Sequence, residues 1–229
     1  MSVHLCYNYY HPKNATRQFE VRACFEANLR NPSIDCIHVV LDSAVEIAQF
    51  LRTYETYRGK IKLLEFRGRP TFLFWMRHLA SLKEGYGIIC NSDIYVPEDT
   101  CMKLKNSKMG QSQCLALSRY NCRGVQPADL RRAVLFNRRD SQDTWIFPLP
   151  LFKASSFGPS VSFPLGRWGC DNRFAYELHK MGFQVKNRAK SHRTYHYHTV
   201  RPQARGPGSQ TVPGPYKFCL LYTSPSPRD

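Results

Sequence analysis

A short polar stretch interrupts an apolar run near the middle of the chain. Residues 85–90 read GYGIIC, and Asn91, Ser92 and Asp93 follow before the apolar run resumes at Ile94. A carboxylate at the end of a buried strand is held rigidly and offers a hard oxygen ligand to a divalent cation. A Ser/Asp turn between two strand pieces explains the same residues without any ligand. The stretch taken alone leaves both interpretations open.

Two histidines in the segment YHYH form a second group with possible chemistry. His196 and His198 lie two positions apart, so on a strand they project from the same face. Such a pair either packs and hydrogen-bonds on a sheet face or joins a site. Because His192, Arg193 and Arg201 are near in sequence, contact with a diphosphate is a further interpretation.

Acidic side chains are scarce in the second half, where residues 111–218 hold 17 Lys and Arg against 5 Asp and Glu. For Asp140 we prefer an ion pair with Arg138 or Arg139. Asp143 precedes the apolar run TWIF. Asp171 begins a helical segment. An acid there either caps the helix or stabilises its first turn through the helix dipole, or, at a cleft, takes a proton from a hydroxyl as a general base.

The first half alternates between short apolar segments and longer amphipathic ones. Strands are predicted at 3–10, 35–42, 60–66 and 86–91, and helices at 15–30, 43–54 and 69–82. We expect Phe19, Ala23, Ala27 and Leu29 to form the apolar face of the first helix, and Ser43 to cap the second. This order predicts a parallel sheet with helices on both faces. Ligands of such sheets bind beyond the carboxyl ends of the strands, where residues 91–93 would lie.

The second half is less regular. It predicts a helix at 100–109, a strand at 113–120, an extended segment broken by proline at 143–152, a helix at 171–182, and final strands at 183–187 and 193–200.

The order of these segments resembles the GT-A glycosyltransferases of the nucleotide-diphospho-sugar transferase superfamily, over roughly Ser2 to Arg201. The resemblance is carried by IICNSDIYV at the place of the D-x-D motif, followed by CLALSRYN, RRDSQDTWIF, GCDNRFAYEL and YHYH. It indicates a small subgroup with an N-S-D variant of that motif. It implies an α/β fold of GT-A type, with a Rossmann-like, largely parallel central sheet flanked by helices in a single domain.

The resemblance also implies roles for the residues at these positions. Asp93 would hold Mn²⁺ or Mg²⁺, with His196 or His198 completing the metal site. Only Asp93 of the motif offers a charge, while Asn91 and Ser92 are expected to meet the nucleotide. Asp171 is the expected general base.

Further candidates complete the predicted site. Asp143 is expected to line the acceptor cleft as the next candidate base. We choose Arg17 and Asp42 for the base and ribose of the donor, and Arg69 for its phosphates. Each of the last three equally suits a surface charge or a helix cap.

The predicted function is a glycosyltransferase, hexosyl or related, that moves a sugar from a nucleotide-diphosphate donor to an acceptor hydroxyl with the help of a metal. The acceptor is a glycan, a lipid or a protein. The alternative is a basic protein that binds single-stranded nucleic acid, because the net charge is +16 and aromatic residues interleave with basic ones in HRTYHYHTVR. The basic residues are scattered and no nucleic-acid-binding motif is present, so we do not expect a nucleic-acid partner.

The chain is expected to divide into a GT-A domain at 1–202, a disordered Pro/Gly-rich tail at 203–218, and CLLYTSPSPRD at 219–229, which looks like a translated sequencing adapter. Eight cysteines precede residue 219 without any CxxC pair, which predicts free thiols in a reducing, cytoplasmic compartment. No apolar run of spanning length is visible, so we expect no membrane span.

Overall fold

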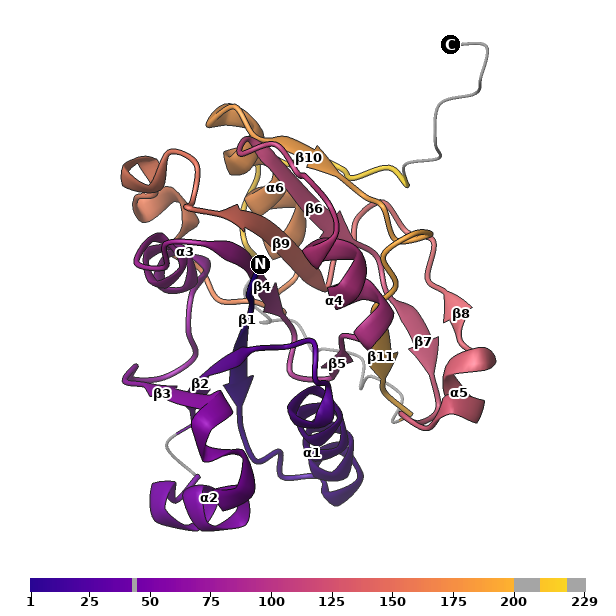
Figure 1. The fold of residues 1–229 in the computed structure, drawn as a ribbon. Helices are drawn as coiled ribbons and strands as arrows, with labels where there is room; N and C mark the ends of the chain where they lie inside the picture. The colour runs from indigo at the N-terminus through magenta and orange to yellow at the C-terminus, as the bar shows by residue number, and fades with distance from the viewer. Residues whose placement is uncertain (43–44, 200–210, 222–229) are drawn as a thin grey trace.

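A seven-stranded sheet forms the centre of the computed structural model, which describes residues 1–42, 45–199 and 211–221 (Figure 1). Its strand order is β10-β6-β9-β4-β1-β2-β3. Neighbouring strands pair in parallel, except that β9 runs antiparallel to both β4 and β6. The largely parallel sheet predicted from the alternation of segments is therefore confirmed. The strands are β1 (Val3–Tyr9), β2 (Cys36–Leu41), β3 (Ile61–Leu64), β4 (Gly85–Cys90), β6 (Gln113–Leu117), β9 (Thr144–Leu149) and β10 (Gln184–Lys186).

Helices cover both faces of this sheet (Figure 1). On one face α3 (Phe72–Ala80) and α6 (Cys170–Lys180) bury their apolar residues against the strands, and on the other face α1 (Ala15–Arg30), α2 (Ile47–Thr53) and α4 (Glu98–Lys105) do so. Alternate residues of β1 belong to different cores, with Leu5 and Tyr7 on the α1 side and Cys6 on the α3 side. The sheet thus separates two apolar layers.

Helix α1 has the predicted bounds but not the predicted apolar face. Asn14 caps it, because its side chain accepts a hydrogen bond of 2.9 Å from the backbone N–H of Arg17. Phe19 is 52% exposed, whereas Glu20 and Asn28 are buried. Of the predicted face Leu29 is buried, but the prediction was wrong for Phe19, and the buried side includes two polar side chains because they have partners inside the protein. Asn28, for example, donates to the carbonyl of Ile94 and accepts from the N–H of Val96.

Helix α2 begins later than predicted. Its first residue is Ile47, and the carboxylate of Glu46 caps it by accepting hydrogen bonds from the N–H groups of Ala48 and Gln49. The predicted cap, Ser43, lies outside the described residues.

The predicted strand at 113–120 divides between two sheets. β6 ends at Leu117, and β7 (Tyr120–Cys122) joins a second sheet in the order β5-β11-β7-β8. Its other members are β5 (Ile94–Tyr95), β8 (Val134–Leu135), which follows α5 (Pro127–Arg131), and β11 (Tyr195–Tyr197). β11 pairs with β5 and with β7, and His196 lies opposite Ile94. The second sheet therefore brings the end of the chain to the residues that follow β4.

Residues 211–221 lie along α6 and the neighbouring loops. Val212 is buried and its N–H donates to the carbonyl of Trp168 at 2.8 Å, while the N–H of Lys217 donates to the carbonyl of Asn172 at 3.0 Å. The tail predicted as disordered at 203–218 lies partly outside the described residues, and its described part makes these contacts.

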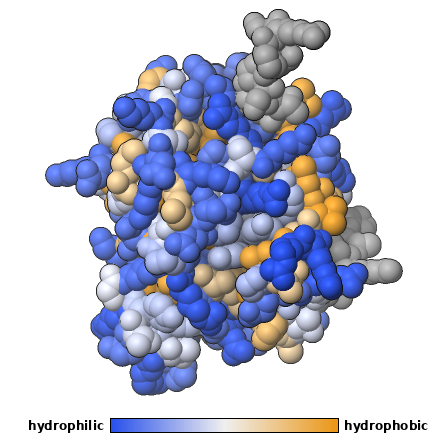
Figure 2. Space-filling view, turned by 45° about the vertical axis from the view of Figure 1, so that its right-hand side comes forward, coloured by the Kyte–Doolittle hydropathy of each residue, from blue (hydrophilic) through white to orange (hydrophobic). Residues whose placement is uncertain are grey.

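The surface is largely hydrophilic in the view of Figure 2. Figure 2 shows a face on which hydrophilic residues predominate and hydrophobic residues form small groups between them. Within the described ranges, none of the helices combines the length and apolar character needed to cross a membrane.

Candidate functional site

Asp93 lies in the turn between β4 and β5, at the carboxyl edge of the main sheet. β4 is buried along its whole length, and Asp93 is itself only 6% exposed. Its backbone carbonyl accepts a hydrogen bond of 3.0 Å from the N–H of Tyr197, so β11 is fixed beside it. The carboxylate is therefore held in a rigid, largely buried position at the edge where parallel sheets bind ligands.

The two late histidines point at this carboxylate. His196 Nε2 lies 2.9 Å from Oδ2 of Asp93, and His198 Nδ1 lies 4.0 Å from the same oxygen. The ligand atoms of Asp93, His196 and His198 all lie within 4.8 Å of one another. The sequence named these three residues, and the structure brings them together.

Arg17 completes the group around Asp93. It lies in the first turn of α1 and donates through Nη2 to Oδ2 of Asp93 and through Nη1 to Glu20, the latter at 2.8 Å. Burial alone would raise the pKa of Asp93, but the charge and hydrogen bond of His196, together with Arg17, hold it well below its usual value. The Asp93 carboxylate is therefore charged across the physiological range.

The pKa of His198 is lowered as well, which for a histidine favours the neutral form. Burial, followed by the positive charges of Arg17 and His196, lowers the pKa of His198. A neutral imidazole is the form that binds a metal.

Glu20 was not recognised from the sequence. It is fully buried beneath Arg17 and also accepts hydrogen bonds from the N–H and hydroxyl groups of Thr199. Its spacing from Arg17, three positions along a helix, was the signal that could have identified it.

A second polar group starts at Asn91. Its Nδ2 donates to Oδ1 of Asp143 at 2.7 Å, and the backbone N–H of Asn91 donates to the Asp143 carbonyl at 3.1 Å. The other carboxylate oxygen of Asp143 accepts from Arg119 Nη1 at 2.6 Å. Arg119 was missed because the sequence placed it inside a continuous strand. Asp143 is thus held by Asn91 on one side and Arg119 on the other.

Asp171 lies next to this group, in the first turn of α6. The helix begins at Cys170 and its cap is Gly169, so Asp171 is a first-turn acid of the helix and not its cap. One carboxylate oxygen accepts a long hydrogen bond, 3.4 Å, from the N–H of Gln142. Burial, and next the negative charge of Asp143, raise the pKa of Asp171 well above its usual value. The Asp171 carboxylate is therefore buried close enough to Asp143 to feel its charge.

Ser92, Asp42 and Arg69 are the remaining predicted site residues. Ser92 donates its hydroxyl to the carbonyl of Asn8 at 2.5 Å, so this side chain holds the turn. Asp42 follows β2, and its N–H donates to the carbonyl of Tyr9 at the end of β1. Arg69 is exposed, but its guanidinium lies against Gly166 beside Asn91. A Cβ added to Gly166 would lie 2.5 Å from Arg69 Nη2 and 3.9 Å from Asn91 Oδ1.

The predicted ion pair of Asp140 with Arg138 is present, with two hydrogen bonds of 2.8 and 2.5 Å. This exposed pair explains Asp140 without a role in the site.

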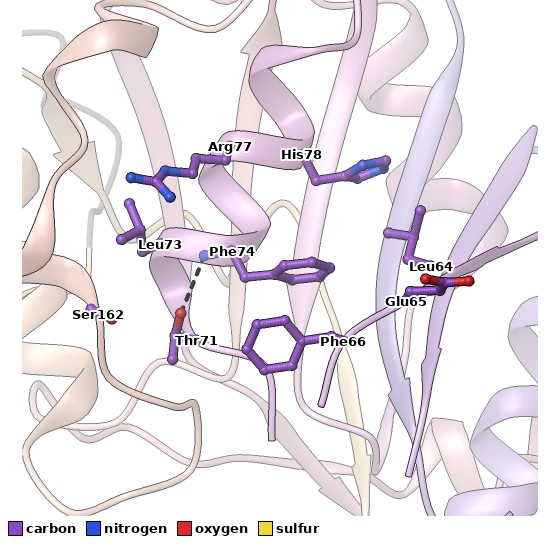
Figure 3. Close-up of a pocket in the computed structure, with 9 residues that line it drawn as sticks. All are labelled: Leu64, Glu65, Phe66, Thr71, Leu73, Phe74, Arg77, His78 and Ser162. Atoms are coloured by element: carbon purple, nitrogen blue, oxygen red, sulfur yellow. Dashed lines mark hydrogen bonds between the residues drawn. The ribbon is translucent and has the colours of Figure 1, made fainter. Parts of the chain in front are cut away.

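A pocket of about 510 Å³ opens elsewhere, between the end of β3 and α3 (Figure 3). The rings of Phe66 and Phe74 pack together in its lining, with centroids 4.5 Å apart, and Arg77 and His78 project from α3 above them. None of the residues that line this pocket is a predicted site residue, so it is separate from the Asp93 group.

Comparison with known proteins rests on structure. No protein-family model matches the chain, and no curated protein sequence does. A mannosyltransferase from Pyrobaculum calidifontis, PcManGT, solved with GDP-Man and Mn²⁺, superposes with a TM-score of 0.55 at 14% identity, over 87% of this chain and 57% of its own. GalNAc-T7, solved with UDP, GalNAc and Mn²⁺, gives 0.52 at 11% identity, over 90% of this chain and 45% of its own.

This chain therefore spans about half the length of these two proteins. At such identities the likeness concerns the arrangement of helices and strands. Together with the seven-stranded sheet and its antiparallel β9, it shows that this chain has the GT-A glycosyltransferase fold.

Proposed function

We propose that this chain is a glycosyltransferase that moves a sugar, hexosyl or related, from a nucleotide-diphosphate donor to an acceptor hydroxyl. The observation that carries the proposal is the cluster of Asp93, His196 and His198 at the carboxyl end of β4 in a GT-A fold. Asp93 occupies the last position of an N-S-D variant of the D-x-D motif. The Mn²⁺ and nucleotide components in the structures of PcManGT and GalNAc-T7 support this assignment.

The cluster suits a divalent ion such as Mn²⁺ or Mg²⁺. One carboxylate and two imidazoles, with ligand atoms within 4.8 Å of one another, form a donor set that Mn²⁺ accepts more readily than Mg²⁺. Asp93, His196 and His198 would hold the ion. When bound, it would neutralise charge on the diphosphate leaving group.

Basic side chains would also neutralise charge on the diphosphate leaving group. The guanidinium of Arg17 contacts Asp93, and Arg69 lies beside Asn91. We assign Arg69 to the donor phosphates and Arg17 and Asp42 to the donor side of the cleft. Asn91 and Ser92 shape the turn beneath it, since both side chains are hydrogen-bonded within the protein.

Asp171 is the proposed general base for an inverting transfer. A base works best when its pKa lies near the working pH, and burial beside Asp143 moves the pKa of Asp171 upward in that direction. Asp171 would take the proton of the acceptor hydroxyl as the oxygen attacks the anomeric carbon. Asp143, fixed by Asn91 and Arg119, would line the acceptor cleft, and its charge helps to raise the pKa of Asp171.

We further propose that residues 1–202 form the catalytic domain.

All nine cysteines lie in the described residues, and each is free and buried. Free thiols favour a reducing compartment such as the cytoplasm.

The experiment is a screen of nucleotide sugars with and without Mn²⁺, scored by calorimetric binding and by release of the nucleoside diphosphate. We expect one donor class to bind and turn over, and Asp93→Ala to lose both metal dependence and turnover. Asp99→Ala, which removes an exposed first-turn carboxylate of α4, is the matched control. The absence of any donor binding, together with oligonucleotide binding that weakens steeply with salt, would favour the nucleic-acid alternative.

A further inference from the structure

A second group of metal-ligating side chains lies away from the Asp93 site, on the face of the sheet that α3 covers. His4 of β1 pairs directly with Cys36 of β2, and Cys6 pairs with His38. Residues two apart on a strand share a face, so His4, Cys36 and His38 project to the same side. Cys36 and His38 are buried, and His4 is partly buried.

The spacing of the two histidine nitrogens in this group is close to that of a tetrahedral site. His4 Nδ1 lies 3.1 Å from His38 Nε2, and the ligand atoms of all three residues lie within 4.8 Å of one another. With metal–nitrogen distances of about 2.0–2.1 Å and a metal–sulfur distance of about 2.3 Å, tetrahedral Zn²⁺ places two nitrogens roughly 3.3 Å apart and nitrogen and sulfur roughly 3.6 Å apart. The two nitrogens already have nearly this spacing, and the sulfur would need to move closer by roughly 1.2 Å at most.

A contact with Ser2 orients the ring of His4 so that Nδ1 faces His38. Nε2 of His4 makes a contact of 3.0 Å with the hydroxyl of Ser2, which leaves Nδ1 facing His38. A hydrogen bond from the second ring nitrogen is the usual way in which a metal-binding histidine is oriented.

Two buried nitrogens beside this group have no partner. His38 is 1% exposed, and its Nδ1 has no hydrogen-bond partner among the described residues. The same holds for Nε2 of His78, whose ring lies 4.4 Å from that of His38 between centroids. Buried polar atoms without a partner are costly. An ion held by Nε2 of His38 would not contact Nδ1 of that ring, but Nε2 of His78 is available to it as a further ligand.

The geometry points to a structural site for Zn²⁺, or for the similar ion Co²⁺, formed by His4, Cys36 and His38 within the N-terminal half of the sheet. Two imidazoles and one thiolate are ligands that Zn²⁺ prefers, and neither Mn²⁺ nor Mg²⁺ favours sulfur. Three protein ligands leave one tetrahedral position, and His78 is the neighbouring imidazole. The ion would tie β1 to β2 under α3.

Protonation is compatible with this role at neutral pH. Burial, followed by the charges of His78, His4 and Lys62, lowers the pKa of His38 to about 3, so its ring is neutral. Burial raises the pKa of the Cys36 thiol, so binding of the ion would displace a proton from sulfur.

The pocket beside α3 provides the approach. His78 belongs to its wall, and in Figure 3 this side chain extends from α3 toward the strand that carries Leu64. An ion that enters the pocket meets His78 first and the ring of His38 next.

The test is a Co²⁺ titration of the full chain after treatment with a chelator, followed by absorbance. We expect one Co²⁺ per chain to give the near-ultraviolet thiolate-to-cobalt band and the intense visible bands of a tetrahedral site. Asp93→Ala should keep this signal, which separates it from the Asp93 group. Cys36→Ala should abolish the thiolate band, whereas Cys101→Ser, a buried thiol on the other face of the sheet, should keep it.

Zn²⁺ competition gives an independent readout. We expect Zn²⁺ to displace Co²⁺ and to raise the melting temperature of the wild type. His4→Gln, a change at a partly buried residue, should weaken Zn²⁺ binding on the order of 100-fold. A wild-type protein without a thiolate band, or a Zn²⁺-induced rise in melting temperature that is equal in Cys36→Ala, would overturn the site. In that case the contact of His4 with His38 is only a hydrogen bond between the two rings.

Discussion

Arg17 and His196 contact the same oxygen of Asp93. The guanidinium donates to Oδ2 from α1, and Nε2 of His196 lies 2.9 Å from that oxygen on β11. A divalent ion at Asp93 would therefore meet a carboxylate whose charge is already balanced, so its affinity without nucleotide depends on Arg17.

The first prediction concerns this competition. Arg17→Met should lower the free energy of unfolding by about 3–5 kcal/mol, because it leaves Asp93 and Glu20 buried with less compensation. Mn²⁺ should restore more stability to the variant than it adds to the wild type, since the ion replaces the lost charge. Urea unfolding with and without Mn²⁺ measures both effects.

Arg22→Met is the control for this experiment, because Arg22 is exposed on the same helix and is 3.8 Å from Glu26. It should change stability little and leave the response to Mn²⁺ unchanged. An equal response to Mn²⁺ in wild type and Arg17→Met would contradict the competition.

The second prediction follows from the lowered pKa of Asp93. A carboxylate whose pKa falls on folding stabilises the protein above its unfolded pKa, near about 3.9, and this contribution is lost as pH falls toward the folded value. Asp93→Asn should therefore be less stable than wild type at pH 7, with a difference that shrinks below about pH 4. Denaturant melts across pH 2–7 check this, with the exposed Glu55→Gln as a control that shows little difference throughout.

The third prediction concerns Asp171, whose pKa shifts in the opposite direction to that of Asp93. Folding raises the pKa of Asp171, so its contribution to stability is full below the unfolded value and declines as pH rises toward the folded one. Asp171→Asn should consequently be more stable than wild type at pH 7–8, while turnover falls on the order of 10²-fold or more with nucleotide binding retained.

Asp99→Asn supplies the comparison for Asp171, since Asp99 also lies in the first turn of a helix but is exposed. It should lose a few tenths of a kcal/mol at most. If Asp171→Asn behaved in the same way and kept its turnover, Asp171 would be a helix-terminal acid and Asp143 the next candidate base.

The fourth prediction concerns Asn91, the first residue of the proposed N-S-D motif. Asn91 is a donor to Asp143, so an aspartate there would place two carboxylates 2.7 Å apart. Asn91→Ala should cost about 1–3 kcal/mol and Asn91→Asp more, because the first removes a donor and the second adds repulsion. Thermal melts at pH 7 rank the three proteins, and an Asn91→Asp variant as stable as wild type would refute this explanation.

The sequence was sufficient for elements whose signals are local. The alternation of apolar and polar residues predicted α1 at its observed bounds, and the apolar run predicted β4 within one residue. Asp93, His196 and His198 were named through the resemblance and the polar stops of their segments. In each case the signal lies within a few residues of the element or side chain that it predicts.

The missing parts depend on contacts between distant segments. The pair of Arg17 with Asp93 joins residues 76 positions apart, and no pattern along the chain indicates it. Arg119 became visible only because β6 ends at Leu117 and the chain then enters another sheet. The buried Glu20 and Asn28 of α1 were excluded from its inner face by polarity, although partners inside the protein make their burial favourable.

The antiparallel strand β9 has a consequence for how the molecule is synthesised. β9 enters the sheet between β4 and β6, although it follows both in the chain. A nascent chain that has emerged only as far as β6 can assemble β3, β2, β1 and β4, but β4 then forms an open apolar edge that is prone to pair with other chains. Completion of the protein up to Leu149 closes that edge, so an interrupted or truncated product is more prone to aggregate than the finished chain.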